Sequence, residues 1–241
     1  METTTYRTLF FNSLESISKS YSMKYSKNAF CTYQRLGDIF WSANFNCGFF
    51  LVDGRLEVKI NSQIKPCDFD EIQFAIIDPE KKHRITDTMR VTAAFAAKSL
   101  QIDSKTYYFP CGDPAGFADK VERYMRTVFD DLLDKRTAFL TSVMSTDSGL
   151  SLYLMSRWED YPFEGGMAYL CKGDYSAAKR CFELVGEKNC IVTKSIGSVG
   201  RYLHLVYIDY CKAMLSGVPW TDELAVNGFS ADAMLWLDGG N

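Results

Sequence analysis

Asp38, Glu57 and Lys59 are the residues whose types and spacing could do chemistry. Glu57 and Lys59 lie two residues apart on a predicted strand, and Asp38 precedes Glu57 by 19 residues. Carboxylates can hold a divalent cation, and a lysine beside them can orient or activate water. The same residues are equally explained as solvated side chains at a turn and on the exposed face of a strand. The sequence leaves both interpretations open.

The order of these three residues resembles the signature of metal-dependent nucleases. In that signature two carboxylates bind Mg²⁺ and the lysine acts on water. A helix followed by strands is also similar to that fold. The resemblance implies a nuclease that uses Asp38, Glu57 and Lys59.

A second charged group consists of Asp68, Asp70 and Glu71, which follow Pro66. Acidic clusters are normally solvated surface, but a patch of one sign can also recognise a basic partner. These three residues are therefore the candidate partner-binding residues. Asp130, Asp131 and Asp134 form a similar cluster further along the chain.

The remaining reactive side chains predict neither a metal site nor a cofactor site. His83 and His204 lie in unrelated contexts, and His204 is expected to be a core histidine. The eight cysteines are too widely spaced for a zinc pair or a Cys-x-x-Cys motif, so we expect buried thiols in a reducing cytosol. The loop 194–201 lacks the spacing of a phosphate-binding loop.

Composition restricts the function further. The formal net charge of −3 provides no basic excess to neutralise phosphates, which argues against a nucleic-acid partner. The apolar runs are too short for a membrane span, and the first residues lack the basic head of a signal peptide. We therefore expect a cytoplasmic protein.

The elements that must position these residues can be predicted from hydrophobic periodicity. An amphipathic helix is expected over 5–22, because Phe10, Leu14 and Ile17 share one face. Short strands with turns between them then predict an antiparallel meander that packs one face on helices. The strands are expected at 29–36, 38–45, 48–52 and 55–65. The segment 67–78 is consistent with a strand or a short helix.

The rest of the chain is predicted to be mostly helical. A helix over 88–100 and a strand over 103–110 precede a long helix that begins at Pro114, with Asp113 as its cap. Three or four more helices are expected after residue 147, with 200–216 buried and the C-terminal stretch anchored by Trp220 and Trp236. The predicted class is α+β, with a sheet region at 1–112 and a helical region at 113–241.

Two weak family resemblances accompany these patterns. Phe30, Arg35, Leu36, Gly37 and Asp38 match a pattern of an uncharacterised bacterial family, over residues 5–140 at most. Members of that family often occur among toxin-immunity systems, so the resemblance implies a small cytoplasmic protein that binds and blocks a toxin. It implies no catalytic residues.

Residues 163–186 resemble the middle of a tetratricopeptide repeat. Gly166 and a tyrosine precede a Gly-Asp-Tyr turn, and Ala178 and Phe182 are expected to pack back from the second helix. A plain helical hairpin uses the same packing. In either case the segment is scaffold.

These observations favour a non-enzymatic, bacterial protein-binding protein that acts by steric occlusion through an aromatic and acidic surface. Its partner is another protein, and under the family resemblance that partner is a toxin. The metal-dependent nuclease and a helical scaffold module are the two alternatives.

Overall fold

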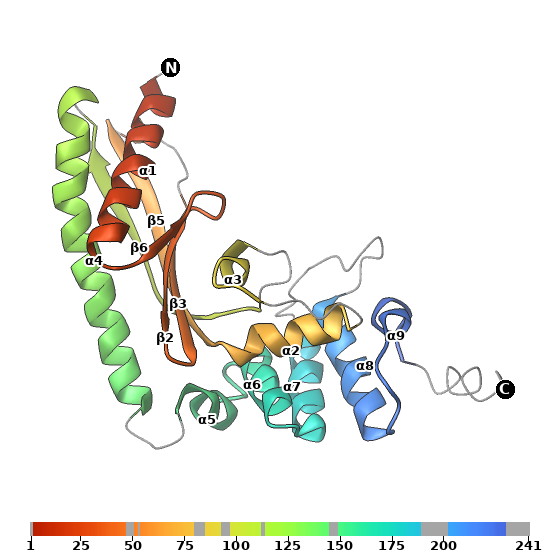
Figure 1. The fold of residues 1–241 in the computed structure, drawn as a ribbon. Coiled ribbons are helices and arrows are strands. Elements are labelled where there is room, and N and C mark those ends of the chain that lie inside the picture. Colours follow the sequence, from red (N-terminus) through yellow and green to blue (C-terminus); the bar gives the residue numbers. More distant parts are fainter. Residues whose placement is uncertain are drawn as a thin grey trace. The chain divides into compact units, whose positions relative to one another are not determined.

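The computed structural model describes residues 2–46, 51–52, 54–79, 85–92, 97–111, 114–144, 149–188 and 202–229. Its fold is α+β, as predicted: an antiparallel sheet in the first half is followed by helices (Figure 1). The chain divides into two compact units, Met1–Pro66 with Ser99–Asp147, and Cys67–Lys98 with Ser148–Asn241. These units differ from the regions 1–112 and 113–241 because the long helix packs on the sheet, whereas 67–98 groups with the helices.

One antiparallel sheet contains all the described strands. β5 is its central strand, because β3 and β4 pair with one edge of it and β6 pairs with the other. The short strand β1 was not predicted, because its residues look like the polar end of the first helix. The strands are β1 (Lys24–Ser26), β2 (Cys31–Leu36), β3 (Ile39–Asn46), β4 (Leu51–Val52), β5 (Arg55–Pro66) and β6 (Leu100–Pro110).

Glycines form the tight turns of the sheet. Gly37 (φ 62°) lies between β2 and β3, and Gly54 (φ 70°) lies between β4 and β5. A positive φ is strained for residues with a Cβ, so glycine suits these turns. The predicted hairpins are therefore confirmed at both positions.

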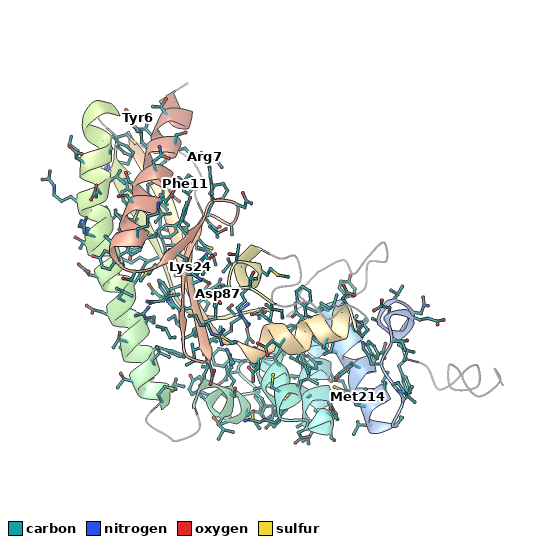
Figure 2. All side chains as sticks on the ribbon, in the orientation of Figure 1. Tyr6, Arg7, Phe11, Lys24, Asp87 and Met214 are labelled. Atoms are coloured by element: carbon teal, nitrogen blue, oxygen red, sulfur yellow. The ribbon has the colours of Figure 1, made fainter. Side chains whose placement is uncertain are left out.

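Two helices, α1 (Glu2–Ser20) and α4 (Pro114–Met144), lie side by side on one face of the sheet (Figure 1). Phe10 of α1 meets the Phe109 ring at 5.1 Å, and Tyr6 meets the Phe117 ring of α4 at 4.8 Å. Figure 2 shows Tyr6 and Phe11 on α1, where the Arg7 guanidinium lies 6.0 Å from the Phe11 ring. Each fully buried apolar side chain of this kind stabilises the fold by about 1.5–3 kcal/mol. The strand residues of this core are Trp41, Ala43, Phe45, Leu56, Val58, Ile60, Tyr107 and Phe109.

The second unit is helical among its described residues. The ambiguous segment after Pro66 forms the helix α2, which contacts α6, α8 and α9. α6, α7 and α8 pack consecutively, and α5 packs on α6. The helices are α2 (Asp68–Ile77), α3 (Met89–Thr92), α5 (Gly149–Ser156), α6 (Pro162–Cys171), α7 (Tyr175–Glu187), α8 (Leu203–Leu215) and α9 (Asp222–Asn227).

The helical hairpin expected at 163–186 is formed by α6 and α7. A Cβ added to Gly166 would lie 2.8 Å from the Phe182 ring, so the two helices approach closely at this glycine. Asp174 caps α7 by accepting a hydrogen bond from the Ala177 amide at 2.9 Å. Gly173, with φ 74°, turns the chain between the helices.

Some predicted elements differ from the structure. The helix expected over 88–100 is described only as α3, and the chain is no longer helical at Ala97. The backbone amide of Ala97 donates to the Asp70 carboxylate at 2.7 Å, so this amide does not form a helical hydrogen bond. α8 is largely buried as predicted, although Leu205 and Leu215 are exposed.

The expected anchor Trp220 is present, because its indole donates to the Ile76 carbonyl at 2.8 Å. Predictions for His83, Asp113, the loop 194–201 and Trp236 fall outside the described residues. Within the ranges given above, every helix is too short or too polar to cross a bilayer.

Candidate functional site

The structure separates Asp38 from Glu57 and Lys59. Asp38 lies in the exposed β2–β3 turn beside Ile39, which pairs with Pro66 at one end of β5. Glu57 lies near the other end of β5. Its distance from Pro66 along the strand is about 30 Å, at a rise of roughly 3.3 Å per residue. The three side chains therefore do not form one Mg²⁺ site, and the described residues contain no other group of three or more potential metal ligands.

Glu57 and Lys59 instead belong to the sheet face that points away from α1 and α4. Glu57 pairs with Tyr108 of β6, and Lys59 pairs with Thr106, which puts these four side chains on one face. Their neighbours Leu56 and Val58 point into the core on the opposite face. The predicted alternation is thus confirmed over residues 56–61 of β5, where Glu57, Lys59 and Asn61 are half-buried or exposed.

We call this surface the open sheet face. Tyr108, one of its members, is 46% exposed, although it is a large aromatic side chain. Ser104 donates to the side-chain oxygen of Asn61 at 2.8 Å, so neighbouring polar groups on the face are mutually ordered. The open sheet face consists of Asn46, Glu57, Lys59, Asn61, Ser104, Thr106 and Tyr108, all exposed or half-buried.

Sequence reasoning missed Tyr108 and Thr106, because 103–110 was treated only as a short strand. The signal was available in the adjacent pair Tyr107 and Tyr108, since neighbouring strand residues point to opposite faces. Tyr107 is buried in the core while Tyr108 is exposed. What periodicity could not supply was the pairing of β6 with β5, which puts Tyr108 beside Glu57.

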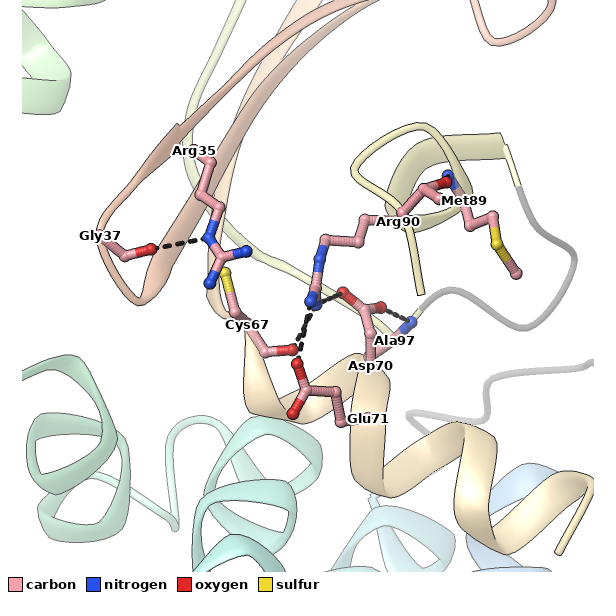
Figure 3. Close-up of polar contacts among 9 residues, drawn as sticks. Arg35, Gly37, Cys67, Asp70, Glu71, Met89, Arg90 and Ala97 are labelled. Carbon is pink, nitrogen blue, oxygen red and sulfur yellow. Dashed lines mark hydrogen bonds and ion pairs between the residues drawn. The ribbon is translucent and has the colours of Figure 1, made fainter. Parts of the chain in front are cut away.

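The acidic group at the start of α2 is not one surface patch. Asp68 and Glu71 are exposed, but Asp70 is only 1% exposed. Asp70 accepts from Arg90 at 3.0 Å and from the Ala97 amide, as Figure 3 shows. The expectation that Asp70 contacts a partner is therefore replaced by an internal role, the countercharge of a buried arginine.

Arg90 completes this buried cluster with two further acceptors. Its guanidinium donates to the Cys67 carbonyl and to the Glu71 carboxylate, the latter at 3.1 Å (Figure 3). Burial alone lowers the pKa of Arg90, but the hydrogen bond and charge of Asp70 outweigh it and raise that pKa. The cluster ties the start of α2 to α3 and to Ala97, which is a structural function.

Two side chains of the second acidic cluster, Asp130 and Asp131, bond to neighbouring residues. Asp131 accepts from Tyr107 at 2.9 Å and pairs with Lys135 at 3.1 Å. Burial raises the pKa of Asp131, but the hydrogen bonds from Lys135 and Tyr107 lower it overall. Asp130 accepts from the Tyr21 hydroxyl at 2.7 Å. These contacts attach α4 to the sheet and to the residue after α1, while Asp130 and Asp134 remain exposed.

The histidine and the cysteines of the described ranges lie mostly in the interior. His204 is buried as predicted for a core histidine, and burial lowers its pKa. Its Nδ1 has no hydrogen-bond partner among the described residues, so the expectation that a core histidine here is satisfied is wrong for this atom. Cys31, Cys67, Cys181 and Cys211 are buried free thiols, and the described cysteines form no disulfide. Burial raises the pKa of Cys31 to about 12, so its reactive thiolate is suppressed.

Neither a family model, nor a curated protein, nor a solved structure matches this chain.

Proposed function

We propose that this chain is a non-enzymatic protein-binding protein that docks a folded partner on the open sheet face. The observation that carries the proposal is the exposed Tyr108 among hydroxyl and amide side chains on one face of the sheet. Tyrosine supplies a large, rigid contact area at a low cost in conformational entropy, and serine and asparagine supply adaptable hydrogen bonds. Protein-recognition surfaces use this combination of residues.

The support beneath the open sheet face also suits binding. On the opposite side of β5 and β6, Leu56, Val58 and Phe109 are buried against α1 and α4. Strands fixed in this way hold the exposed side chains in a preorganised arrangement, which reduces the free-energy cost of ordering them on binding. The charges of Glu57 and Lys59 lie next to each other along β5 and supply orientation and selectivity more than affinity.

A toxin is the specific partner we propose, with steric occlusion as the mechanism. The resemblance of residues 5–140 to a bacterial family found among toxin-immunity systems supports this choice. A toxin bound to the open sheet face would have its active surface covered. This chain would then inhibit the toxin without carrying out any reaction. The protein is then a cytoplasmic inhibitor.

The proposal is tested by capture from a lysate of the native host. Immobilised wild type is compared with Tyr108→Ala and Lys59→Glu, and with Lys120→Glu as a control at an exposed lysine of α4. We expect one partner to be retained by wild type and by the Lys120→Glu control. Recovery should fall about tenfold or more with Tyr108→Ala, because central aromatic contacts contribute most of the binding energy at such surfaces.

Equal recovery of the same partner by all four proteins would place the binding surface elsewhere. Recovery of every form as a lone monomer would remove the protein-binding function itself. Circular dichroism spectra of the variants should match that of wild type, since the substituted side chains are exposed.

A further inference from the structure

The outer edge of β6 has no neighbouring strand. β6 pairs with β5 along one side, opposite the side on which β5 pairs with β3 and β4. Among the described residues, no backbone group of another segment bonds to the other side of this 11-residue strand. An edge strand of this kind presents a row of unpaired N–H and C=O groups, which can pair with a strand of another chain.

The hydrogen bonds to β5 show which backbone groups of β6 point outward. The Cys111 amide donates to the Gly54 carbonyl at 2.8 Å, one residue pair past Pro110. In an antiparallel ladder, pairs that exchange hydrogen bonds alternate with pairs that do not. This alternation holds as far as Asp103, because the register with β5 is regular up to that residue. The non-proline residues of this stretch whose backbone groups point away from β5 are Ser104, Thr106 and Tyr108.

Pro110 supports this assignment. It lies two residues after Tyr108, so its nitrogen also points away from β5, and its missing N–H removes no hydrogen bond from the ladder. Proline is tolerated in edge strands at positions where the N–H side faces solvent. The exposed residues of β6 are Gln101, Ser104, Lys105, Tyr108 and Pro110.

The helix α4 packs beside β6 without enclosing its outer edge. Lys105 lies 3.5 Å from Asp131, and Asp103 pairs with Lys135 at 2.9 Å, so β6 meets α4 through two ion pairs. The four side chains are 21% to 51% exposed. The charges along this edge are therefore in contact with water and open to a further partner.

A second copy of the chain matches these charges. Two copies related by a two-fold axis would pair their β6 strands antiparallel, with the same surface used on both sides. Asp103 and Lys105 are the only charged residues of β6. An axis at Ser104 therefore places Asp103 of each copy directly opposite Lys105 of the other, and such opposite-charge pairs stabilise a sheet. An axis at Lys105 would instead place two lysines opposite each other, which is unfavourable.

We propose that the chain forms a homodimer in which the β6 strands of two copies pair antiparallel about a two-fold axis at Ser104. The two six-stranded sheets then form one continuous sheet. On each side of the axis, Lys135 and Asp103 of one copy continue into Lys105 and Asp131 of the other, so the charges alternate in sign. The interface uses the backbone of β6 and the charged side chains on its helix-covered side. It therefore stands or fails independently of the partner proposed for the open sheet face.

The first test measures the molar mass of the full chain by sedimentation equilibrium over a wide range of concentrations. We expect the mass to rise from 27.4 kDa toward twice that value as the concentration increases. Ser104→Pro removes an N–H that points away from β5, as Pro110 does, so the fold should be kept. The dissociation constant of the dimer should rise about tenfold or more, because the hydrogen bonds at the axis are lost.

Charge reversal tests the register. Asp103→Lys places lysines opposite lysines, and Lys105→Asp places aspartates opposite aspartates, so each change should raise the dissociation constant about tenfold or more. Mixed in equal amounts, the two variants should bind each other more tightly than either binds itself, because every opposite pair again joins unlike charges. Each variant loses its ion pair with α4 in the mixture as well as alone, so recovery reports the contact between copies. Asp119→Lys, at an exposed aspartate of α4, is the matched control and should dimerise like wild type.

Three results would overturn this interface. One is a wild-type mass of 27.4 kDa at every concentration. Another is a dimer that neither Ser104→Pro nor the single charge reversals weaken. The third is a mixture of the two charge-reversed variants that associates no better than each variant alone. Melting temperatures verify that the variants are folded, and if Ser104→Pro does not fold, the charge-reversed pair decides alone, because its substituted side chains are partly exposed.

Discussion

At individual residues, the role that the neighbouring sequence suggests can differ from the role that the folded structure gives the side chain. Asp68, Asp70 and Glu71 are equivalent in the sequence as an acidic run, yet only Asp70 is enclosed, with Arg90 as its countercharge. The partner of Asp70 lies 20 positions away, so no local rule identifies it.

The Asp70–Arg90 pair makes a strong prediction about stability. Arg90→Met should lower the free energy of unfolding by roughly 3–5 kcal/mol, because it leaves the buried Asp70 carboxylate without a countercharge. Arg157→Met, which removes an exposed ion pair with Asp160, should leave the free energy of unfolding nearly unchanged, because solvent screens such a pair. Urea denaturation followed by circular dichroism measures both.

A second substitution separates charge burial from general loss of packing. Asp70→Leu added to Arg90→Met removes both charges and should recover much of the lost stability. If the double variant is no more stable than Arg90→Met alone, the unpaired charge of Asp70 is not the main cause of the lost stability. The cluster then stabilises the fold through packing and through the hydrogen bonds of the Cys67 carbonyl and the Ala97 amide.

At the scale of elements, strongly periodic segments could be predicted and short or ambiguous ones could not. The alternation of Leu56, Val58 and Ile60 predicted β5. Apolar residues at helical spacing between Phe117 and Val143 predicted α4, which is 31 residues long. The segment after Pro66 stayed ambiguous, because an apolar run of this length suits a strand or a helix equally. β1 is only 3 residues long and exists through its pairing with β2.

The α6–α7 hairpin supplies a prediction at this scale. Gly166→Ala should destabilise the protein by about 1–3 kcal/mol, since the new methyl group would overlap the Phe182 ring. Gly116→Ala in α4 meets no heavy atom within 4 Å and should stabilise by roughly 0.5–1 kcal/mol through helix propensity. Melting temperatures of the two variants provide the comparison, and a neutral Gly166→Ala would show that the helices can separate at this contact without cost.

At the scale of the whole molecule, the sequence predicted the α+β class but not the composition of the two units. Each unit combines segments that are distant in the chain, because Cys67–Lys98 leaves the sheet unit before β6 returns to it. A division by position along the chain cannot anticipate this. The open sheet face depends on the same arrangement. It forms only because β6 pairs with β5, although the segment Cys67–Lys98 between them belongs to the other unit.

Photo-cross-linking tests the proposed partner surface most directly. A photoreactive phenylalanine analogue is placed at Tyr108 in the native host, and in a second strain at Tyr202, which is 47% exposed but lies on the helical unit. Irradiation should yield one discrete adduct with another protein from position 108 and none from position 202. No adduct from position 108, or the same adducts from both positions, would contradict a partner docked on the open sheet face.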